Sequence, residues 1–543
     1  MRWYKESIVY QIYPRSFNDS NNDGIGDIRG IIEKIDYLKD LGIDVIWLSP
    51  VYDSPLDDNG YDIRDYYSIL AEYGTMDDFK EMLHKLHENG IKLIMDLVVN
   101  HTSDEHKWFL EAKKDKNSKY RNYYYFREKK DINNWTSFFG GSAWSYNKET
   151  DDYYLHLFSK KQPDLNWNNK EVRKEIHEIL KFWLDIGVDG FRCDVINLIS
   201  KVESLPKGKN IIPILQGRKH YINGPFIHEY LQEIKDKVFS KYDMFTVGEC
   251  VFINPKIALS YIEEGIDELN MVFQFDHMAA DNFLVKWFPK RFKLKKLKRA
   301  LSKWQYALNN KGWNSLYFEN HDQPRSIDRF GSLHYHKESA KMLATYLFFQ
   351  QGTPFIYQGQ EIGMTNPDFK ELSDYKDVET HNVYKIGRRK LKLSHKNMMN
   401  RIRKVSRDNA RTPMQWDDSI YSGFSTCDPW INVNNNYKKI NVVNNIKDND
   451  SIYHYYRRLI RMKKENRTLI YGDYLEHSKN NKNLAIYERN LDNEKIVVVA
   501  SFSNKVLSFK FPYDRADYII IVSNYNNNKE KLLPYEVRVY KNN

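Results

Sequence analysis

Short apolar runs alternate with amphipathic helical stretches through the first two-thirds of the chain. Eight of these runs have the length and residue content of strands buried on both faces. They cover residues 7–13, 45–50, 92–99, 190–195, 245–249, 271–275, 315–319 and 354–358. Helical patterns lie between them, as over 171–186, where six apolar residues share one stripe. Eight strand-then-helix units predict an α/β fold, a (β/α)₈ TIM barrel.

Interruptions of this pattern predict two further domains. Residues 102–167 follow the third strand, are rich in aromatic residues and are too long for a loop, so we expect a small inserted subdomain. The catalytic barrel would then comprise residues 1–101 and 168–465, with another long interval over 363–450. From residue 466 to 543, strand-like runs at 484–489, 495–502, 506–511, 518–522 and 535–540 predict a C-terminal antiparallel β-sandwich domain.

Composition narrows the function classes. The 543 residues are 41% hydrophobic and 29% charged, and no apolar run is long enough to span a bilayer. The net charge of +10 is dispersed except over residues 290–303, where apolar spacing favours a helix with a basic solvent face over a nucleic-acid site. The chain start lacks the apolar core of a signal peptide, and three cysteines form no disulfide framework. We therefore expect a cytoplasmic protein without nucleic-acid, membrane or protein partners.

Three short segments at the ends of predicted strands each end on an acid. Asp194 ends Gly-Phe-Arg-Cys-Asp, Glu249 ends Thr-Val-Gly-Glu, and Asp322 ends Glu-Asn-His-Asp. Strands of a parallel barrel bring their carboxyl ends to one face, which carries the active site. Glycosidic bond cleavage needs one acid that donates a proton and a second that attacks or activates water. One such acid could be structural, but three in this order predict a carbohydrate-cleaving site.

The residues around these acids resemble the sequence regions of the α-amylase superfamily, glycoside hydrolase family 13. The resembling segments are residues 96–101 (Asp-Leu-Val-Val-Asn-His), 190–194, 248–249 and 320–322. Residues 162–166 (Gln-Pro-Asp-Leu-Asn) resemble a fifth region of the oligo-1,6-glucosidase branch. The resemblance is specific, because its motifs occur in order from residue 10 to residue 416.

The resemblance implies a role for each acid. Asp194 would be the nucleophile, Glu249 the general acid/base, and Asp322 a third carboxylate that binds sugar hydroxyls. His101 and His321 would bind hydroxyls of the same glucose. Strand alternation places Arg192 on the same face as Asp194, so its charge should keep that carboxylate ionised. The implied mechanism is retaining, with the two reacting carboxyls about 5–5.5 Å apart rather than ~9 Å.

Two further motifs bear on the size of the pocket. In the exo-acting branch of the family, an Asp after strand two and a later Arg hold the non-reducing glucose. The resemblance makes these Asp62 and Arg411, which would limit the pocket to one glucose; an ion pair within the loops is the alternative. Tyr61 would stack on the sugar ring, and Phe158 and Phe139 are weaker candidates for the same contact.

The residue after the nucleophile bears on the linkage. Val195 at this position accompanies α-1,6 preference in the family, whereas Ala or Thr accompanies α-1,4. The resemblance thus implies a retaining, exo-acting α-glucosidase acting on α-1,6 bonds at the non-reducing end of isomalto-oligosaccharides. Cys250, Val251 and Phe252 follow Glu249 where close relatives have Met-Pro-Gly, which leaves the leaving group open. Trehalose-6-phosphate hydrolase, α-1,4-glucosidase and sucrose isomerase are the alternatives on this scaffold.

The loop over residues 19–27 has the spacing of the first part of an EF-hand calcium loop. Its oxygen ligands would be the side chains of Asp19, Asn21, Asp23 and Asp27 and the backbone carbonyl of Ile25. The acidic ligand of position 12 is missing, and a loop of Asx turns without metal is the alternative. Relatives with this loop bind Ca²⁺, so the resemblance implies a structural Ca²⁺ ion.

A non-catalytic binding subunit on the same fold, like the heavy chains of amino-acid transporters, is the competing class. Those proteins have a membrane helix and lack the catalytic acids. This sequence has no such helix and keeps all three acids. We therefore expect an enzyme whose partner is a small oligosaccharide.

Overall fold

A parallel sheet forms the centre of the computed structural model, which describes residues 2–210, 215–283, 285–526 and 530–543. Its strand order is β11-β10-β9-β5-β2-β1-β15-β14. The strands are Val9–Ile12 (β1), Val45–Leu48 (β2), Lys92–Leu97 (β5), Gly190–Cys193 (β9), Phe245–Glu249 (β10), Met271–Phe273 (β11), Ser315–Leu316 (β14) and Thr353–Tyr357 (β15). All eight predicted strands are confirmed, most of them shorter than expected.

The two edges of this sheet meet. A parallel bridge joins Val272 of β11 to Asn314, the residue before β14. The hydroxyl of Ser315 also donates to the Val272 carbonyl at 2.8 Å. The sheet therefore closes into the expected TIM barrel, and closure removes the exposed edges that an open sheet would have.

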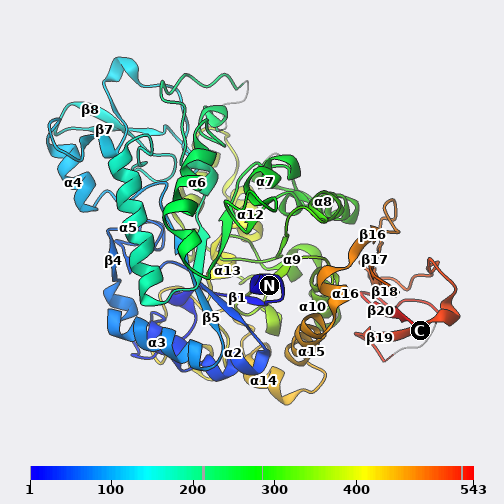
Figure 1. Ribbon diagram of the computed structural model, residues 1–543. Coiled ribbons are helices and arrows are strands. Elements are labelled where there is room, and N and C mark those ends of the chain that lie inside the picture. Colours follow the sequence, from blue (N-terminus) through cyan, green and yellow to red (C-terminus); the bar gives the residue numbers. More distant parts are fainter. Residues whose placement is uncertain (1, 211–214, 284, 527–529) are drawn as a thin grey trace.

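Helices pack around the barrel and within the added segments (Figure 1). They are Ile28–Ile32 (α1), Ile35–Leu41 (α2), Met76–Glu88 (α3), Lys107–Lys114 (α4), Lys170–Ile186 (α5), Ile227–Lys237 (α6), Pro255–Ile262 (α7), Leu294–Leu308 (α8), Ser326–Phe330 (α9), His336–Phe348 (α10), Val378–Arg389 (α11), His395–Val405 (α12), Asp408–Arg411 (α13), Val442–Lys447 (α14), Ile452–Glu465 (α15) and Arg467–Tyr471 (α16). Within the described ranges, none of these helices has both the length and the apolar character needed to cross a membrane.

Local chemistry explains where α5 begins and ends. The side chain of Asn169 accepts a hydrogen bond from the Glu171 amide and caps the first turn. Gly187 adopts φ 112°, a left-handed conformation that ends the helix. The predicted apolar stripe is buried between these caps, and each buried Val, Leu or Ile contributes about 1.5–3 kcal/mol.

The basic run over residues 290–303 lies mostly on α8. Its apolar stripe is buried, as predicted. Lys298 departs from the expected solvated face, because its side chain is buried and its ammonium donates to the carbonyls of Ser478 and Leu484. This basic run therefore also fastens the C-terminal domain to the barrel.

The segment after β5 contains α4 and a small antiparallel sheet. Its strands are Phe126–Arg127 (β6), Asp152–Leu155 (β8) and Trp144–Asn147 (β7), in that spatial order. A buried ion pair of 2.9 Å joins Asp164, near the end of this segment, to Lys201 in the loop after β9. The segment therefore packs beside the end of β9, as an inserted subdomain would; the boundaries 102 and 167 remain a prediction.

The C-terminal domain contains one five-stranded antiparallel sheet in the order β16-β17-β18-β20-β19. The strands are Asp473–Glu476 (β16), Leu484–Leu491 (β17), Glu494–Ser501 (β18), Tyr518–Ser523 (β19) and Val537–Asn542 (β20). The strand predicted over 506–511 is wrong. Only Leu507 forms a bridge there, with Leu532, while Phe509 and Phe511 pack on the sheet. Alternating apolar residues can cover a sheet without joining its hydrogen-bonded ladder.

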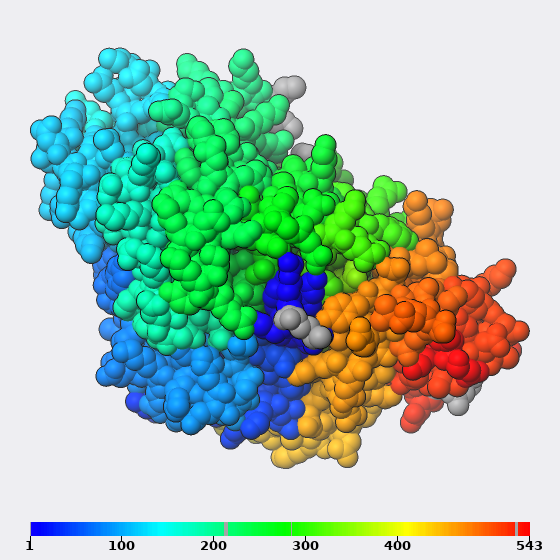
Figure 2. Space-filling model, in the orientation of Figure 1, coloured from blue at the N-terminus to red at the C-terminus, as the bar shows by residue number. Residues whose placement is uncertain are grey.

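The two added parts lie at opposite ends of the molecule. Figure 1 shows β7 and β8 far from the strands β16 to β20, and Figure 2 shows the same separation on the molecular surface. The long interval after β15 contains the helices α11 to α14, which cover less than half of its residues. Polar and basic residues dominate that interval, so its sequence did not predict α11 or α12.

Candidate active site

The three strand-end acids line one pocket of about 1060 Å³. Asp194 directly follows β9, Glu249 is the last residue of β10, and Asp322 lies in the loop after β14. Tyr61 and His101 line the same pocket. The structure therefore brings together acids that lie far apart in the sequence, at the carboxyl ends of parallel strands.

Arg192 connects the acids from beneath the pocket lining. Its side chain is 2% exposed and donates from Nη1 to Asp194 Oδ1 at 2.6 Å. The second terminal nitrogen, Nη2, donates to Glu249 Oε2 at 2.5 Å. Asp96, which is fully buried, binds the same guanidinium. Both reacting carboxyls thus share one cation, and Arg192 and Asp194 lie on one face of β9 as alternation predicted.

Burial sets different protonation states for these two acids. It raises the pKa of Asp194 to about 6, although the Arg192 guanidinium acts in the opposite direction. Burial also raises the pKa of Glu249 to about 8, opposed by Arg192 and assisted by the charges of Asp194 and Asp322. Near neutral pH, Asp194 is ionised and Glu249 holds a proton, the division of labour that a nucleophile and a general acid require.

Asp322 lies among cations on another wall of the pocket. Its Oδ1 is 2.7 Å from Arg411 Nη2 and 3.5 Å from Arg407 Nη1. Burial would raise the pKa of Asp322, but the neighbouring His321, Arg407 and Arg411 lower it well below its ordinary value. This carboxylate therefore stays ionised and can accept hydrogen bonds from sugar hydroxyls.

His321 lies behind the pocket lining, between two nearly parallel tyrosine rings. The ring centroids of Tyr13 and Tyr61 are 6.2 Å and 5.2 Å from that of His321. Gln11 contacts its Nδ1 at 2.7 Å, and its Nε2 is 3.6 Å from Asp322. Burial lowers the pKa of His321 to about 3, so the ring is neutral and can position the adjacent carboxylate.

Five of the other candidate substrate contacts line the pocket directly: Tyr61, His101, Phe139, Phe158 and Val195. The Tyr61 hydroxyl donates to Asp96 at 3.1 Å, and the backbone carbonyl of Tyr61 lies 3.0 Å from His101 Nε2. The rings of His101 and Phe158 are 5.2 Å apart. Val195 has φ 34° in the left-handed region, which turns the chain away immediately after the nucleophile.

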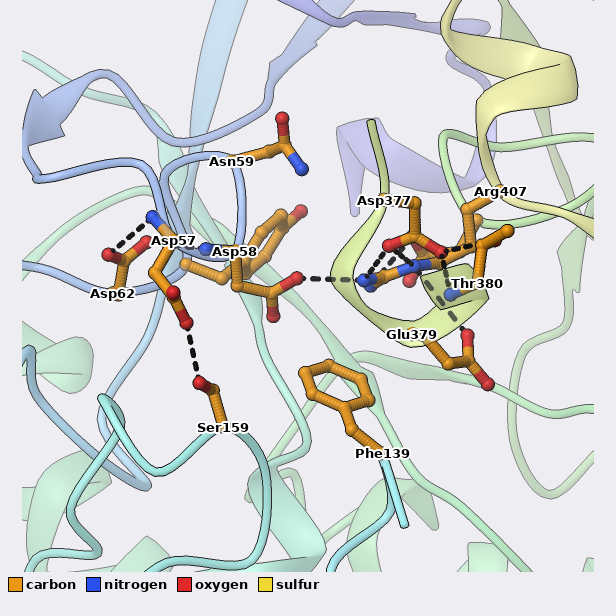
Figure 3. Close-up of polar contacts among 12 residues, drawn as sticks. Asp57, Asp58, Asn59, Asp62, Phe139, Ser159, Asp377, Glu379, Thr380 and Arg407 are labelled. Carbon is orange, nitrogen blue, oxygen red and sulfur yellow. Dashed lines mark hydrogen bonds and ion pairs between the residues drawn. The ribbon is translucent and has the colours of Figure 1, made fainter. Parts of the chain in front are cut away.

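One acid–arginine pair on the pocket wall is Asp58–Arg407 (Figure 3). Arg407 Nη2 donates to Asp58 Oδ1 at 2.8 Å. The carboxylate of Asp62 instead accepts the backbone N–H groups of Asp57 and Asp58, at 2.8 Å and 3.0 Å. Arg411 is fully buried and binds Asp322. The prediction of Asp62 and Arg411 as the pair that closes the pocket is therefore wrong.

Local backbone geometry explains this correction. Leu56 and Asn59 have left-handed φ values of 63° and 52°, so the loop folds back on itself around residue 58. The loop closes over the carboxylate of Asp62 and leaves that of Asp58 facing the pocket. The choice between acids four residues apart depends on this turn, which the sequence pattern did not reveal.

Acidic residues that the sequence analysis missed hold Arg407 in place. Asp377, which is fully buried, accepts from Arg407 Nε and Nη2 at 3.0 Å and 2.5 Å. Glu379 lies 3.7 Å from Nε, and the ring of Phe139 lies 5.0 Å beneath the guanidinium (Figure 3). Lys286 binds Glu379 at 2.6 Å and also lines the pocket. No sequence motif marked Asp377, Glu379 or Lys286, because these contacts come from segments distant in the sequence.

The loop over residues 19–27 satisfies many of its own polar groups. Both carboxylate oxygens of Asp19 accept loop amides at 2.8 Å, and Asp27 caps α1. All the candidate ligand atoms of this loop are oxygens, the type of ligand that a hard cation such as Ca²⁺ prefers. In the described part of the chain, no group of three or more His, Cys, Asp or Glu is arranged to hold a metal. Asn21, the Ile25 carbonyl and the exposed Asp23 would therefore all have to contribute.

Comparison with known proteins identifies the class. The model of the alpha amylase catalytic domain matches residues 11–472. The chain therefore belongs to the α-amylase family and is a glycoside hydrolase. It is 53% identical to an oligo-1,6-glucosidase of Parageobacillus thermoglucosidasius over 558 aligned positions, which cover 99% of each chain.

Solved structures of similar enzymes have the same fold. The chain superimposes on the trehalose-6-phosphate hydrolase of Bacillus licheniformis with a TM-score of 0.93, at 46% identity and with 99% of each chain covered. It superimposes on the isomaltulose synthase of Klebsiella sp. LX3 with a TM-score of 0.95, at 40% identity and with 99% of each chain covered. The barrel and its two additions are thus common to enzymes whose names differ in substrate.

Proposed function

We propose that this enzyme is a retaining, exo-acting α-glucosidase that hydrolyses α-1,6-glucosidic bonds at the non-reducing end of isomalto-oligosaccharides. The carrying observation is the single Arg192 guanidinium that binds both Asp194 and Glu249. Two carboxyls on one guanidinium fit the retaining separation of about 5–5.5 Å better than the inverting ~9 Å. Four relatives at 48% to 53% identity are named oligo-1,6-glucosidase, which supports the linkage.

The proposed reaction has two steps. In the first, the Asp194 carboxylate attacks the anomeric carbon while Glu249 gives its proton to the departing glycosidic oxygen. A covalent glucosyl–Asp194 ester forms and the remaining sugar leaves. In the second, ionised Glu249 takes a proton from water, and the water oxygen attacks the same carbon while the bond of that carbon to Asp194 breaks. This releases α-glucose and restores the Asp194 carboxylate and the protonated Glu249. Asp322 would bind hydroxyls of the distorted ring throughout.

The remaining pocket residues would bind the non-reducing glucose. Tyr61 and His101 line the pocket beside the nucleophile. Asp58 and Arg407 supply a carboxylate and a guanidinium that suit the outer hydroxyls of one glucose. With this end closed, the enzyme would remove single glucose units, which is exo action. Val195, Phe158 and His321 would shape the same site.

Trehalose-6-phosphate hydrolysis is the second candidate, because the cations Lys286, Arg329, Lys390 and Arg401 line the pocket. Lys286 lies 2.6 Å from Glu379 and Arg329 lies 2.7 Å from Asp281, so a phosphate would have to compete with those two carboxylates. We place the neutral sugar first because four relatives at 48% to 53% identity are named oligo-1,6-glucosidase. Cleavage of α-1,4 bonds and isomerisation of sucrose would use the same acids and differ only in the leaving group.

A substrate panel tests the proposed function. Isomaltose, maltose, trehalose-6-phosphate and sucrose would be compared at equal concentration, with the first anomer of released glucose followed by NMR. We expect the highest kcat/KM on isomaltose and α-glucose as the first product. Preference for maltose or for the phosphate ester would overturn the linkage, and initial β-glucose would overturn the mechanism.

The nucleophile assignment has its own test. Asp194→Asn should lower kcat by several orders of magnitude, because the amide cannot form the glycosyl ester. The melting temperature should stay close to that of the wild type, since Asn has nearly the same shape. Asp77→Asn, an exposed acid on α3, is the matched control and should keep full activity. Normal turnover in Asp194→Asn would exclude this role.

We also propose that the loop over residues 19–27 binds a structural Ca²⁺ ion. The oxygen-only donor set supports this, and the distance in sequence from the acids separates it from the chemistry. Excess chelator should lower the melting temperature by several degrees at unchanged kcat, and Asp23→Asn should abolish that shift. A melting temperature insensitive to chelator would contradict the proposal.

A cytoplasmic location is a further proposal. The three cysteines of the chain are free thiols, two of them buried, which suits a reducing compartment. A reporter fusion or fractionation of the source cells would test it, and recovery outside the cytoplasm would refute it.

A further inference from the structure

Phe252 lies three residues after Glu249. Hydrophobic packing explains neither its backbone conformation nor the solvent exposure of its side chain. It lines the pocket, and 54% of its surface is exposed. Its φ is +56°, in the left-handed region that a bulky L-residue rarely adopts. Strain of this kind persists only where the surrounding structure enforces it, and it gathers at functional sites.

Hydrogen bonds enforce this conformation. The Val251 amide donates to Asn197 Oδ1 at 3.1 Å, and Asn197 Nδ2 donates to the Val251 carbonyl at 2.9 Å. Asn223 Oδ1 accepts from Asn197 at 3.1 Å and from the Tyr261 hydroxyl at 2.7 Å. The residue before Phe252 is therefore held on both backbone groups by an anchored side chain, and the aromatic ring stands on a rigid support.

The position of the ring relates it to the leaving group. Asn197 belongs to the turn after the nucleophile Asp194, so the same hydrogen bonds join the two reacting segments. Asp58 and Arg407 mark the end of the pocket that takes the non-reducing glucose. Phe252 instead lies three residues after the residue that protonates the departing oxygen and lines the same pocket, which makes its ring a candidate contact for the departing sugar.

One face of the ring is already covered. The Arg218 guanidinium lies over it, 5.7 Å from the centroid, at a distance typical of a cation–π contact. Arg218 therefore shields part of one face, and the 54% exposure leaves much of the ring open. A flat aromatic face open to a carbohydrate pocket suits the apolar C–H face of a pyranose, whereas a phosphate group has no such face.

We propose that Phe252 is the stacking platform for the sugar ring of the leaving group, and hence determines specificity for neutral sugars on that side. This inference rests on the proposed function, because it takes the departing group to be a glucose unit of an isomalto-oligosaccharide. The strained backbone is the cost of presenting the ring, and the hydrogen bonds of Asn197 hold it there.

The test compares Phe252→Ala, Phe252→Asn and Phe252→Tyr. Two quantities would be measured for each: KM for isomaltose, and Ki for 1-deoxynojirimycin, a glucose-sized inhibitor that fills only the glucose end. We expect Ala and Asn to raise KM roughly three- to tenfold, and Tyr to preserve it. Ki should change by less than about twofold in all three, because the glucose end is untouched.

Thermal stability supplies a second readout. Asn tolerates a left-handed backbone better than Phe does, so Phe252→Asn should raise the melting temperature while it weakens isomaltose binding. Phe226→Ala, an aromatic residue that is 37% exposed and does not line the pocket, is the matched control. It should leave both KM and Ki unchanged.

Several outcomes would overturn the inference. An unchanged KM with a lower melting temperature in Ala and Asn would make Phe252 a packing residue. Equal increases in KM and Ki would show general damage to the pocket. If the wild type prefers another α-glucoside to isomaltose, the proposed function is wrong, but the role of Phe252 can still be tested. KM would then be measured for that α-glucoside, and a rise in KM without a rise in the Ki of 1-deoxynojirimycin would support the stacking role.

Discussion

Arg192 holds no reacting atom, yet it governs how the two reacting carboxyls relate to one another. It keeps Asp194 and Glu249 close and offsets part of the burial that would neutralise both. The pKa of Asp194 is then about 6 and that of Glu249 about 8. This difference lets Asp194 act as the nucleophile while Glu249 donates a proton. Two acids of similar type thus acquire different roles from their surroundings alone.

This difference predicts a bell-shaped pH dependence of kcat/KM, with limbs near pH 6 and pH 8. Below the lower limb Asp194 gains a proton and cannot attack. Above the upper limb Glu249 loses the proton that it must donate. The two limbs belong to the coupled pair, so initial rates on isomaltose across this range give apparent values. A flat profile would contradict these protonation states.

At the scale of elements, hydrogen bonds join the N-terminal ends of α11 and α13. The Asp377 side chain accepts from Arg407, and the Asp408 side chain accepts the Asp377 amide at 2.9 Å. The hydroxyls of Thr380 and Ser406 lie 2.8 Å apart between the same segments. Because α11 also carries part of the pocket wall, these contacts place Arg407 relative to that wall.

Asp377→Asn should loosen the glucose end of the pocket. It removes the charge nearest to the buried Arg407, and breaking a buried ion pair costs about 3–5 kcal/mol when no partner remains. Asp58 still binds this arginine, so we expect a smaller loss of stability and a roughly tenfold rise in the Ki of 1-deoxynojirimycin, about 1.4 kcal/mol.

Thr380→Val is the matched control for this variant. It removes the hydroxyl that donates to Asp377 at 3.0 Å but leaves every contact of Arg407 in place. We expect a stability loss of about 1 kcal/mol and an unchanged Ki. An equal effect of the two variants on Ki would show that α11 as a whole, rather than the ion pair, positions the arginine.

At the scale of the whole molecule, one buried arginine joins the C-terminal sheet to the barrel. Arg489 of β17 donates to the carbonyls of Phe349, Leu469, Ile470 and Gly472, at the ends of α10 and α16. Helix ends leave such carbonyls without intrahelical partners. Of these carbonyls, only that of Phe349 lies before residue 466, so Arg489 links the sheet to the barrel through Phe349 and to the connecting helix α16 through the others.

Arg489→Met should lower the free energy of unfolding by about 3 kcal/mol or more, because several buried carbonyls lose their donor. Turnover by the folded enzyme should not change, since the contacts of Arg489 are not with residues of the pocket. Urea unfolding with an activity assay checks both parts. Arg461→Met, an exposed arginine on α15, is the control. A lower kcat in Arg489→Met at full folding would contradict this separation.

Particular elements show how far the sequence could be read. The eight barrel strands were predictable because buried parallel strands need continuous apolar runs. The helix α5 was predictable because its caps and its stripe agree. The strand over 506–511 was not, because alternation is the same whether a segment pairs in a sheet or packs on its face.

The sequence by itself determined the barrel and the three acids at its mouth, because strand period and strand ends are local properties of the chain. Tertiary structure decided that Asp58 rather than Asp62 meets an arginine across the pocket, and that this arginine is Arg407. It also decided the pKa values of Asp194 and Glu249 and the exposure of Phe252. The direction of a side chain, its burial and the charges around it depend on contacts between segments that lie far apart in the sequence. A local sequence pattern contains no information about these contacts.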